Sequence, residues 1–98
     1  MTPPDWGEHG ATRTPGWLRK AEDQLKRAAS ESPAAFFDFR RAMGGEGSMA
    51  RFEGRGMTQG DGVHFNQKGG AYVAQLVVGA LRRAFDAWSE VHPRAACE

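Results

Sequence analysis

The chain has 98 residues and a mass of 10.7 kDa, which allows one domain with a small hydrophobic core. Thirteen basic and 12 acidic side chains give a net charge of +1, and this near-balance excludes recruitment of nucleic acid or of an anionic membrane by overall charge. The single cysteine, Cys97, excludes an internal disulfide and a zinc site made of several thiolates.

Residues 1–13 predict a loop, because prolines and glycines interrupt them and no apolar period runs through them. A helix is expected to begin at Pro15 with Thr14 as its N-cap, since proline at the first helical position loses no hydrogen bond. Apolar residues recur at helical spacing over 17–29, opposite a charged face. This pattern predicts an amphipathic helix that ends within 30–33.

Residues 34–39, Ala-Ala-Phe-Phe-Asp-Phe, are apolar on both faces and rich in aromatic rings. This pattern is typical of a strand buried on both sides in a parallel sheet, which needs neighbouring strands and covering helices. No second convincing strand is present, so the sequence predicts part of an α/β domain. We therefore expect Phe36, Phe37 and Phe39 to be poorly covered and the chain to be oligomeric, aggregation-prone or weakly cooperative in melting.

Seven of the 13 glycines lie between residues 44 and 62, which predicts an irregular loop with one helical turn at 48–53. Asn66 is then expected to cap a second long helix, and residues 90–98 are expected to fray. The predicted buried stripe of this helix consists of Val73, Leu76, Val77, Ala80, Leu81, Ala84 and Trp88.

Asp61 and His64 lie on the glycine-rich loop just before the capped helix. An imidazole that acts as a general base needs one free nitrogen, while a carboxylate holds the other N–H and fixes the tautomer. A carboxylate three residues earlier, across a turn loosened by Gly62, can reach the ring. The spacing alone does not favour a catalytic pair. An Asp and a His at this spacing more often bond only to the nearby backbone.

The block Asp61-Gly62-Val63-His64-Phe65-Asn66-Gln67-Lys68-Gly69-Gly70, followed by an apolar helix, resembles the last motif of the SGNH (GDSL) hydrolases. Residues 42–49 look like a stretch of some bacterial members, and Pro3-Pro4-Asp5 is similar to a segment that follows an earlier strand there. The resemblance implies the C-terminal part of a three-layer α/β/α, flavodoxin-like fold and ester hydrolysis by a Ser-His-Asp triad. It gives His64 the role of general base and Asp61 that of its orienting carboxylate.

The nucleophile motif of that family, Gly-Asp-Ser, is absent, and the only asparagine, Asn66, stands beside the base. The serine and the oxyanion donors are therefore expected to lie outside this chain. Gly44 and Gly45 are expected to line the substrate cleft. Ser48, in the same loop, is either a substitute nucleophile or the cap of the short helix.

The resemblance implies a small acyl ester or an O-acetylated carbohydrate as substrate and no cofactor. The spacing of the histidines does not support a metal site, and no nucleic acid is expected as a partner. No apolar run reaches the ~18 residues of a membrane span, and the first residues lack a signal-peptide pattern, so the compartment is left open. The alternative function is an inactive fragment or a small helical module that binds a partner or a second copy through Trp17 and Trp88.

Overall fold

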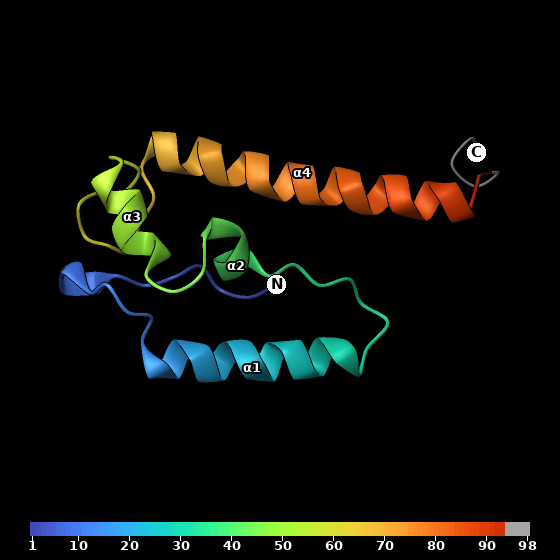
Figure 1. Ribbon diagram of the computed structural model, residues 1–98, viewed down its shortest axis with the longest axis horizontal. Helices are drawn as coiled ribbons and strands as arrows, with labels where there is room; N and C mark the ends of the chain where they lie inside the picture. The colour runs from blue at the N-terminus through green and yellow to red at the C-terminus, as the bar shows by residue number, and fades with distance from the viewer. Residues whose placement is uncertain (94–98) are drawn as a thin grey trace.

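A computed structural model describes residues 1–93 of the chain. Helices α1 and α4 run along the two long sides of the molecule, and α2 lies between them beside the N-terminal segment (Figure 1). The molecule measures 51 × 30 × 15 Å, so it is little thicker than one helix of about 10–12 Å. Of the predicted frayed tail, 90–98, residues 94–98 with Cys97 lie outside the described residues, whereas residues 90 and 91 belong to the last helix. The elements are a 3₁₀ turn at Glu8–Gly10, α1 at Gly16–Ser30, α2 at Phe39–Met43, α3 at Ser48–Gly54 and α4 at Gln67–Val91.

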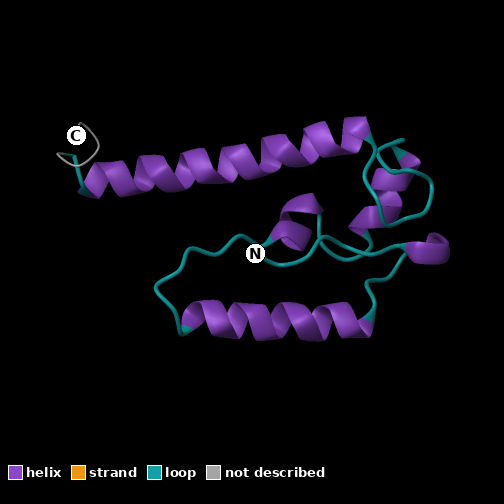
Figure 2. Cartoon of the chain, turned by 180° about the vertical axis from the view of Figure 1, so that it is seen from behind, coloured by secondary structure: helices purple, strands orange, loops and turns teal. Residues whose placement is uncertain are grey.

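The predicted α/β, flavodoxin-like fold is wrong, because residues 1–93 contain no sheet (Figure 2). Their only β pairing is an isolated antiparallel bridge between Thr58 and Phe65. The segment before α2 is extended and lies near the N-terminal segment, where the Thr2 N–H donates to the Phe37 carbonyl at 3.0 Å. Because prolines at positions 3 and 4 have no N–H, this pairing cannot continue as a ladder.

The residues of the predicted strand are instead divided between an extended segment and α2. Asp38 is the N-cap of α2, and its Oδ1 accepts the Arg41 N–H at 3.1 Å. Phe36 is 39% exposed, whereas Phe39 is 8% exposed and packs in the core. Incomplete cover is therefore found at Phe36 but not at Phe39.

The first long helix is confirmed, but its start differs by one residue. Pro15 has ψ of 144°, which is extended, so it is the N-cap and α1 begins at Gly16. Thr14 does not cap the helix, because its hydroxyl donates to the Asp5 carboxylate at 2.7 Å. The Thr14 side chain, which the sequence pattern predicted as the cap of α1, therefore makes a buried polar contact instead.

The N-terminal segment is not a surface loop, because several of its polar side chains are buried. Asp5 is 1% exposed, and its second oxygen accepts the Met49 N–H at 3.0 Å. Glu22 of α1 is 2% exposed and accepts from Arg40 Nε at 2.6 Å and from Lys26 Nζ at 2.7 Å. Buried polar contacts therefore join α1 and the N-terminal segment to α2 and α3.

The apolar core is small and lies between α2, α3 and the start of α4. The centroid of the Phe52 ring lies 5.5 Å from that of Tyr72, with the rings edge to face, and 5.8 Å from that of Phe65. Three of the five buried residues of this core are methionines, whose flexible side chains suit an irregular core. The buried cluster consists of Phe39, Met43, Met49, Phe52 and Met57.

The second long helix is confirmed together with its cap, since the Asn66 side chain accepts the Gly69 N–H at 2.9 Å. Its predicted buried stripe is only partly right. The first four members are half-buried, whereas Leu81, Ala84 and Trp88 are exposed, because α4 extends beyond the other elements. None of the helices within residues 1–93 is both long and apolar enough to cross a membrane.

Candidate functional site

The candidate site lies on the loop between α3 and α4, which folds back on itself as a short hairpin. The Gln59 N–H donates to the His64 carbonyl at 2.9 Å, and the Asn66 N–H donates to the Met57 carbonyl at 3.1 Å. Phe65 packs its ring into the core next to Phe52. Its neighbour His64 is consequently directed outward, and its side chain is 68% exposed.

Asp61 and His64 are in direct contact. Asp61 Oδ2 lies 2.6 Å from Nδ1 of the His64 ring, which is the contact that the sequence led us to expect. No hydrogen bond or ion pair within the described residues uses Nε2 of His64. The pair therefore has the arrangement that a general base requires, with one nitrogen held by a carboxylate and the other free to accept a proton.

The Asp61 carboxylate is held mainly by the backbone of its own turn. Its Oδ1 accepts the His64 N–H at 2.8 Å and the Val63 N–H at 2.9 Å. The hydrogen bond from the His64 backbone, followed by those from the His64 ring and from Val63, holds the pKa of the Asp61 carboxyl far below its ordinary value. Asp61 is therefore ionised at any pH at which ester hydrolysis would be measured.

Gly62 allows the turn that brings the two side chains together. Its φ is +69°, a conformation that side chains rarely adopt, and a Cβ there would overlap the carbonyl oxygen of Gly7. The Gly7 N–H in turn donates to the Gly62 carbonyl at 2.8 Å. The N-terminal segment thus packs against the turn and supports it through Gly7. No pattern in the sequence indicated this role for Gly7.

Asn66 connects the hairpin to α4. While its Oδ1 caps the helix, its Nδ2 donates to the Gly56 carbonyl at 2.7 Å and to the Thr58 carbonyl at 2.9 Å. The sequence predicted the cap but not these two bonds. Together they fix the position of the hairpin relative to the helix that follows.

Gly44 and Gly45 lie on a separate loop, between α2 and α3. Their N–H groups donate to the carbonyls of Arg41 and Arg40, and the Arg51 guanidinium donates to the Gly44 carbonyl at 2.8 Å. These bonds stay within the loop and its two flanking helices. The structure does not connect this loop with Asp61 and His64, and its role in a substrate cleft stays a prediction.

Ser48 fits neither of its two predicted roles. Gly47 is the N-cap of α3 and no side chain caps this helix, so Ser48 is not the cap. Its hydroxyl is buried, with 0% of the residue exposed, and has no hydrogen-bond partner within residues 1–93. A serine without access to solvent or to a base cannot act as the nucleophile in this conformation.

The other histidines lie apart from the pair. His9 borders a hollow of about 400 Å³ that reaches Asp61, and its Nε2 lies 3.5 Å from Glu8. His92 follows α4 at its far end, where its ring stacks on Trp88. Within residues 1–93, no group of three histidine, cysteine or acidic side chains is placed to hold a metal ion.

Comparisons of the chain with protein-family models, with curated proteins and with solved structures found no match. The resemblance to the SGNH hydrolases therefore stays a hypothesis based on residues 61–70 and on the two shorter stretches. The function must be argued from the side chains themselves.

Proposed function

We propose that Asp61 and His64 are the orienting carboxylate and the general base of an ester hydrolase whose serine and oxyanion donors lie outside this chain. The observation that carries the proposal is the 2.6 Å contact between Asp61 Oδ2 and His64 Nδ1, which leaves Nε2 free on an exposed ring. The resemblance of residues 61–70 to the SGNH hydrolases supports the same roles. The substrate class is a small acyl ester, including an O-acetylated carbohydrate.

In this reaction Nε2 of His64 takes the proton of the serine hydroxyl as the oxygen attacks the ester carbonyl. The same nitrogen then returns the proton to the leaving alcohol, and the acyl group remains on the serine. Water, which gives its proton to Nε2, next attacks the acyl-serine, and that proton passes to the serine oxygen as the acid leaves. Asp61 keeps the Nδ1–H tautomer in place and stabilises the imidazolium that forms in each half of the reaction. The developing oxyanion needs donors that Asp61 and His64 do not supply, so the two residues are half of a catalytic site.

The test compares initial rates on an activated acetyl ester at one pH near 8. The 98-residue chain should hydrolyse the ester no faster than its His64→Ala variant, because the nucleophile is missing. A chain extended at its N-terminus by its own upstream coding sequence should be active. His64→Ala should lower that activity by about 10²–10⁴-fold, the usual contribution of a general base.

Asp61→Asn should also lower the activity of the extended chain, whereas His92→Ala, a matched control at the far end of α4, should not. Activity of the extended chain that is indifferent to His64 would contradict the proposal. Robust, His64-dependent hydrolysis by the 98 residues alone would contradict the external serine.

We also propose a second function, association with another polypeptide, which a separate observation favours. Large apolar side chains are exposed on both long helices, including Trp17 at 57% on α1 and Leu81 at 65% on α4. Exposed apolar surface of this extent is typical of an interaction surface. The two functions are compatible, because Asp61 and His64 lie before α4 and outside these surfaces.

A further inference from the structure

Helix α4 has two apolar faces, and the molecule covers only one of them. On the inner face, residues such as Val73 and Val77 are half-buried against α2 and the extended segment before it. On the other face, every apolar side chain is exposed. We call this face the outer stripe; it consists of Ala71, Ala74, Val78, Leu81, Phe85 and Trp88.

The spacing of the outer stripe indicates what shape of partner it fits. Its members alternate in steps of three and four and so repeat every seven residues. That period keeps a seam of side chains facing one straight neighbour, because two helices that pack along a heptad seam coil slightly around each other. The outer stripe therefore matches a second α-helix better than a sheet or a small ligand.

The aromatic end of the stripe is already ordered. The rings of Phe85 and Trp88 lie 6.2 Å apart, and His92 stacks on Trp88 at 4.6 Å with 12° between the planes. The His92 ring also has its Nδ1 2.9 Å from the Trp88 carbonyl oxygen. Side chains that are fixed before binding lose less conformational entropy when a partner arrives.

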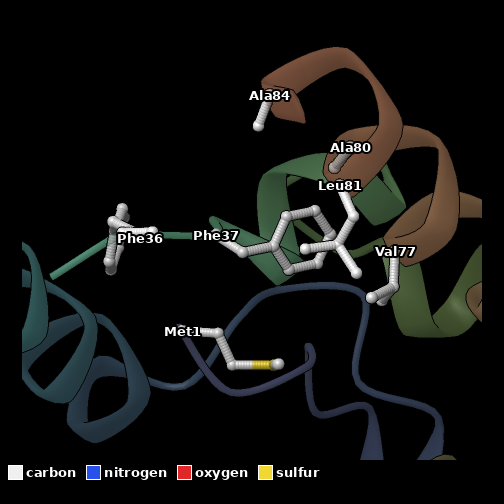
Figure 3. A pocket seen from close by; sticks show the side chains of 8 residues that line it. Met1, Phe36, Phe37, Val77, Ala80, Leu81 and Ala84 are labelled. Atoms are coloured by element: carbon white, nitrogen blue, oxygen red, sulfur yellow. The ribbon is translucent and has the colours of Figure 1, made fainter. Parts of the chain in front are cut away.

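The stripe continues into a cavity beside the extended segment. Leu81 belongs to the stripe and also lines an apolar cavity of about 320 Å³ together with Met1, Phe36 and Phe37 (Figure 3). Met1 is 66% exposed and Phe36 is 39% exposed. Val77, Ala80 and Ala84 of the inner face line the same cavity. Met1 and Phe36 therefore border the outer stripe at Leu81, where the two faces of α4 meet.

The exposed area is close to what one protomer of a stable dimer contributes. Val78, Leu81, Phe85 and Trp88 are 53%, 65%, 56% and 43% exposed. With Met1 and Phe36 at the edge of the stripe, and at about 150–250 Å² for each large side chain, they present on the order of 500–800 Å². A standard interface buries about 800 Å² per partner. A second copy would bring an equal area, and a self-complementary patch is what a two-fold dimer requires.

We propose that the chain forms a homodimer in which the outer stripes of two α4 helices pack against each other. This inference rests on the association function above and names its partner as a second copy. It is independent of the catalytic role of Asp61 and His64.

The mass of the chain in solution, measured by sedimentation equilibrium over a range of concentrations, tests the proposal. The wild-type chain should reach twice its 10.7 kDa and dissociate on dilution. Leu81→Glu, and separately Val78→Glu, should shift the mass to that of a monomer, because each puts a charge into the seam. Leu25→Glu is the matched control, since Leu25 is a 41% exposed leucine on α1, and it should remain dimeric.

Circular dichroism of each variant shows that its helices are retained; because Val78 and Leu81 are both exposed, neither change should unfold the chain. A wild-type chain that is monomeric at every concentration would overturn the homodimer, and association with a different polypeptide would be what is left of the association function. A wild-type dimer that persists in Leu81→Glu and Val78→Glu would overturn the outer stripe alone. Loss of the dimer in Leu25→Glu as well would also overturn it.

Discussion

At the scale of single residues, Asn66 and Gly62 show how the candidate pair is positioned. Asn66 was predicted as a cap from its place before an apolar helix, and its side chain additionally holds the Gly56 and Thr58 carbonyls. Gly62 was predicted to loosen the turn, and its positive φ agrees with that. The contact between Asp61 and His64 could be foreseen because it is local. The support from Gly7 could not, since it joins residues 55 positions apart.

The first prediction concerns the titration of Asp61, whose pKa is lowered chiefly by the backbone N–H of His64 and then by the His64 ring. In His64→Ala the backbone bonds remain while the ring is lost. The pKa of Asp61 should therefore rise in this variant but stay below its ordinary value of 3.8. NMR of the carboxyl carbon during an acid titration measures both values.

His92→Ala is the control, because it also removes an imidazole, at the far end of α4, and should leave the titration of Asp61 unchanged. An Asp61 that titrates near 3.8 in the wild-type chain would contradict the hydrogen-bonded turn. An identical pKa in wild type and His64→Ala would contradict the contact with the ring.

At the scale of elements, local signals predicted α1, α3 and α4, missed α2 and predicted a strand that the described residues do not contain. Both long helices and the short helix at residues 48–54 follow from apolar period, capping and glycine placement. The aromatic run at 34–39 instead forms a segment without regular structure up to Asp38 and the first residue of α2. A strand also needs a partner with free donors, and the N-terminal segment supplies one N–H, from Thr2, before two prolines. Pairing is a property of two segments, so one segment could not predict it.

The second prediction uses two adjacent glycines in the first turns of α4. A Cβ at Gly69 would overlap the Met57 carbonyl oxygen, whereas a Cβ at Gly70 would meet nothing within 4 Å. Gly69→Ala should therefore lower the free energy of unfolding by about 1–3 kcal/mol through overpacking. Gly70→Ala should raise it by about 0.5 kcal/mol, because alanine is the better helix former.

Urea unfolding followed by circular dichroism gives both values. The Met57 carbonyl also accepts the Asn66 N–H, so Gly69→Ala should weaken the contact between Asp61 and His64 as well. Equal effects of the two substitutions would show that α4 does not approach Met57 as closely as described.

At the scale of the whole molecule, the chain is open rather than compact. Its radius of gyration is 15.8 Å, compared with about 13 Å for a compact domain of about 100 residues. The small apolar core lies toward one end of the molecule. Helix α1 is attached to α2 by the pairs Glu22–Arg40 and Lys26–Asp38. Buried charge pairs in this position make the stability of the molecule depend on pH.

The last prediction follows from Glu22. Its hydrogen bond from Arg40, and more weakly that from Lys26, lowers the pKa of Glu22 below its ordinary 4.5, although burial opposes the shift. A carboxyl whose pKa is lower in the folded state stabilises the fold above the unfolded-state pKa, and this contribution is lost as the pH falls through the folded value. Glu22→Gln removes the nearer charged partner of Arg40, whose side chain is 16% exposed, and leaves only Glu46 in ion-pair distance, at 3.8 Å. At pH 7 this should cost on the order of 3 kcal/mol.

The difference between wild type and Glu22→Gln should shrink below pH 4.5, because a protonated Glu22 is as neutral as the glutamine that replaces it. Some acid sensitivity should remain in the variant, because hydrogen bonds from Arg41 and Lys26 also lower the pKa of Asp38 against the opposing effect of burial.

Asp23→Asn, a change at the exposed neighbour of Glu22, should alter stability by less than about 0.5 kcal/mol. Urea unfolding at fixed protein concentration, repeated between pH 3 and pH 7, measures all three chains. A difference between wild type and Glu22→Gln that is the same at every pH would mean that Glu22 contributes through packing, and the attachment of α1 would then not depend on charge.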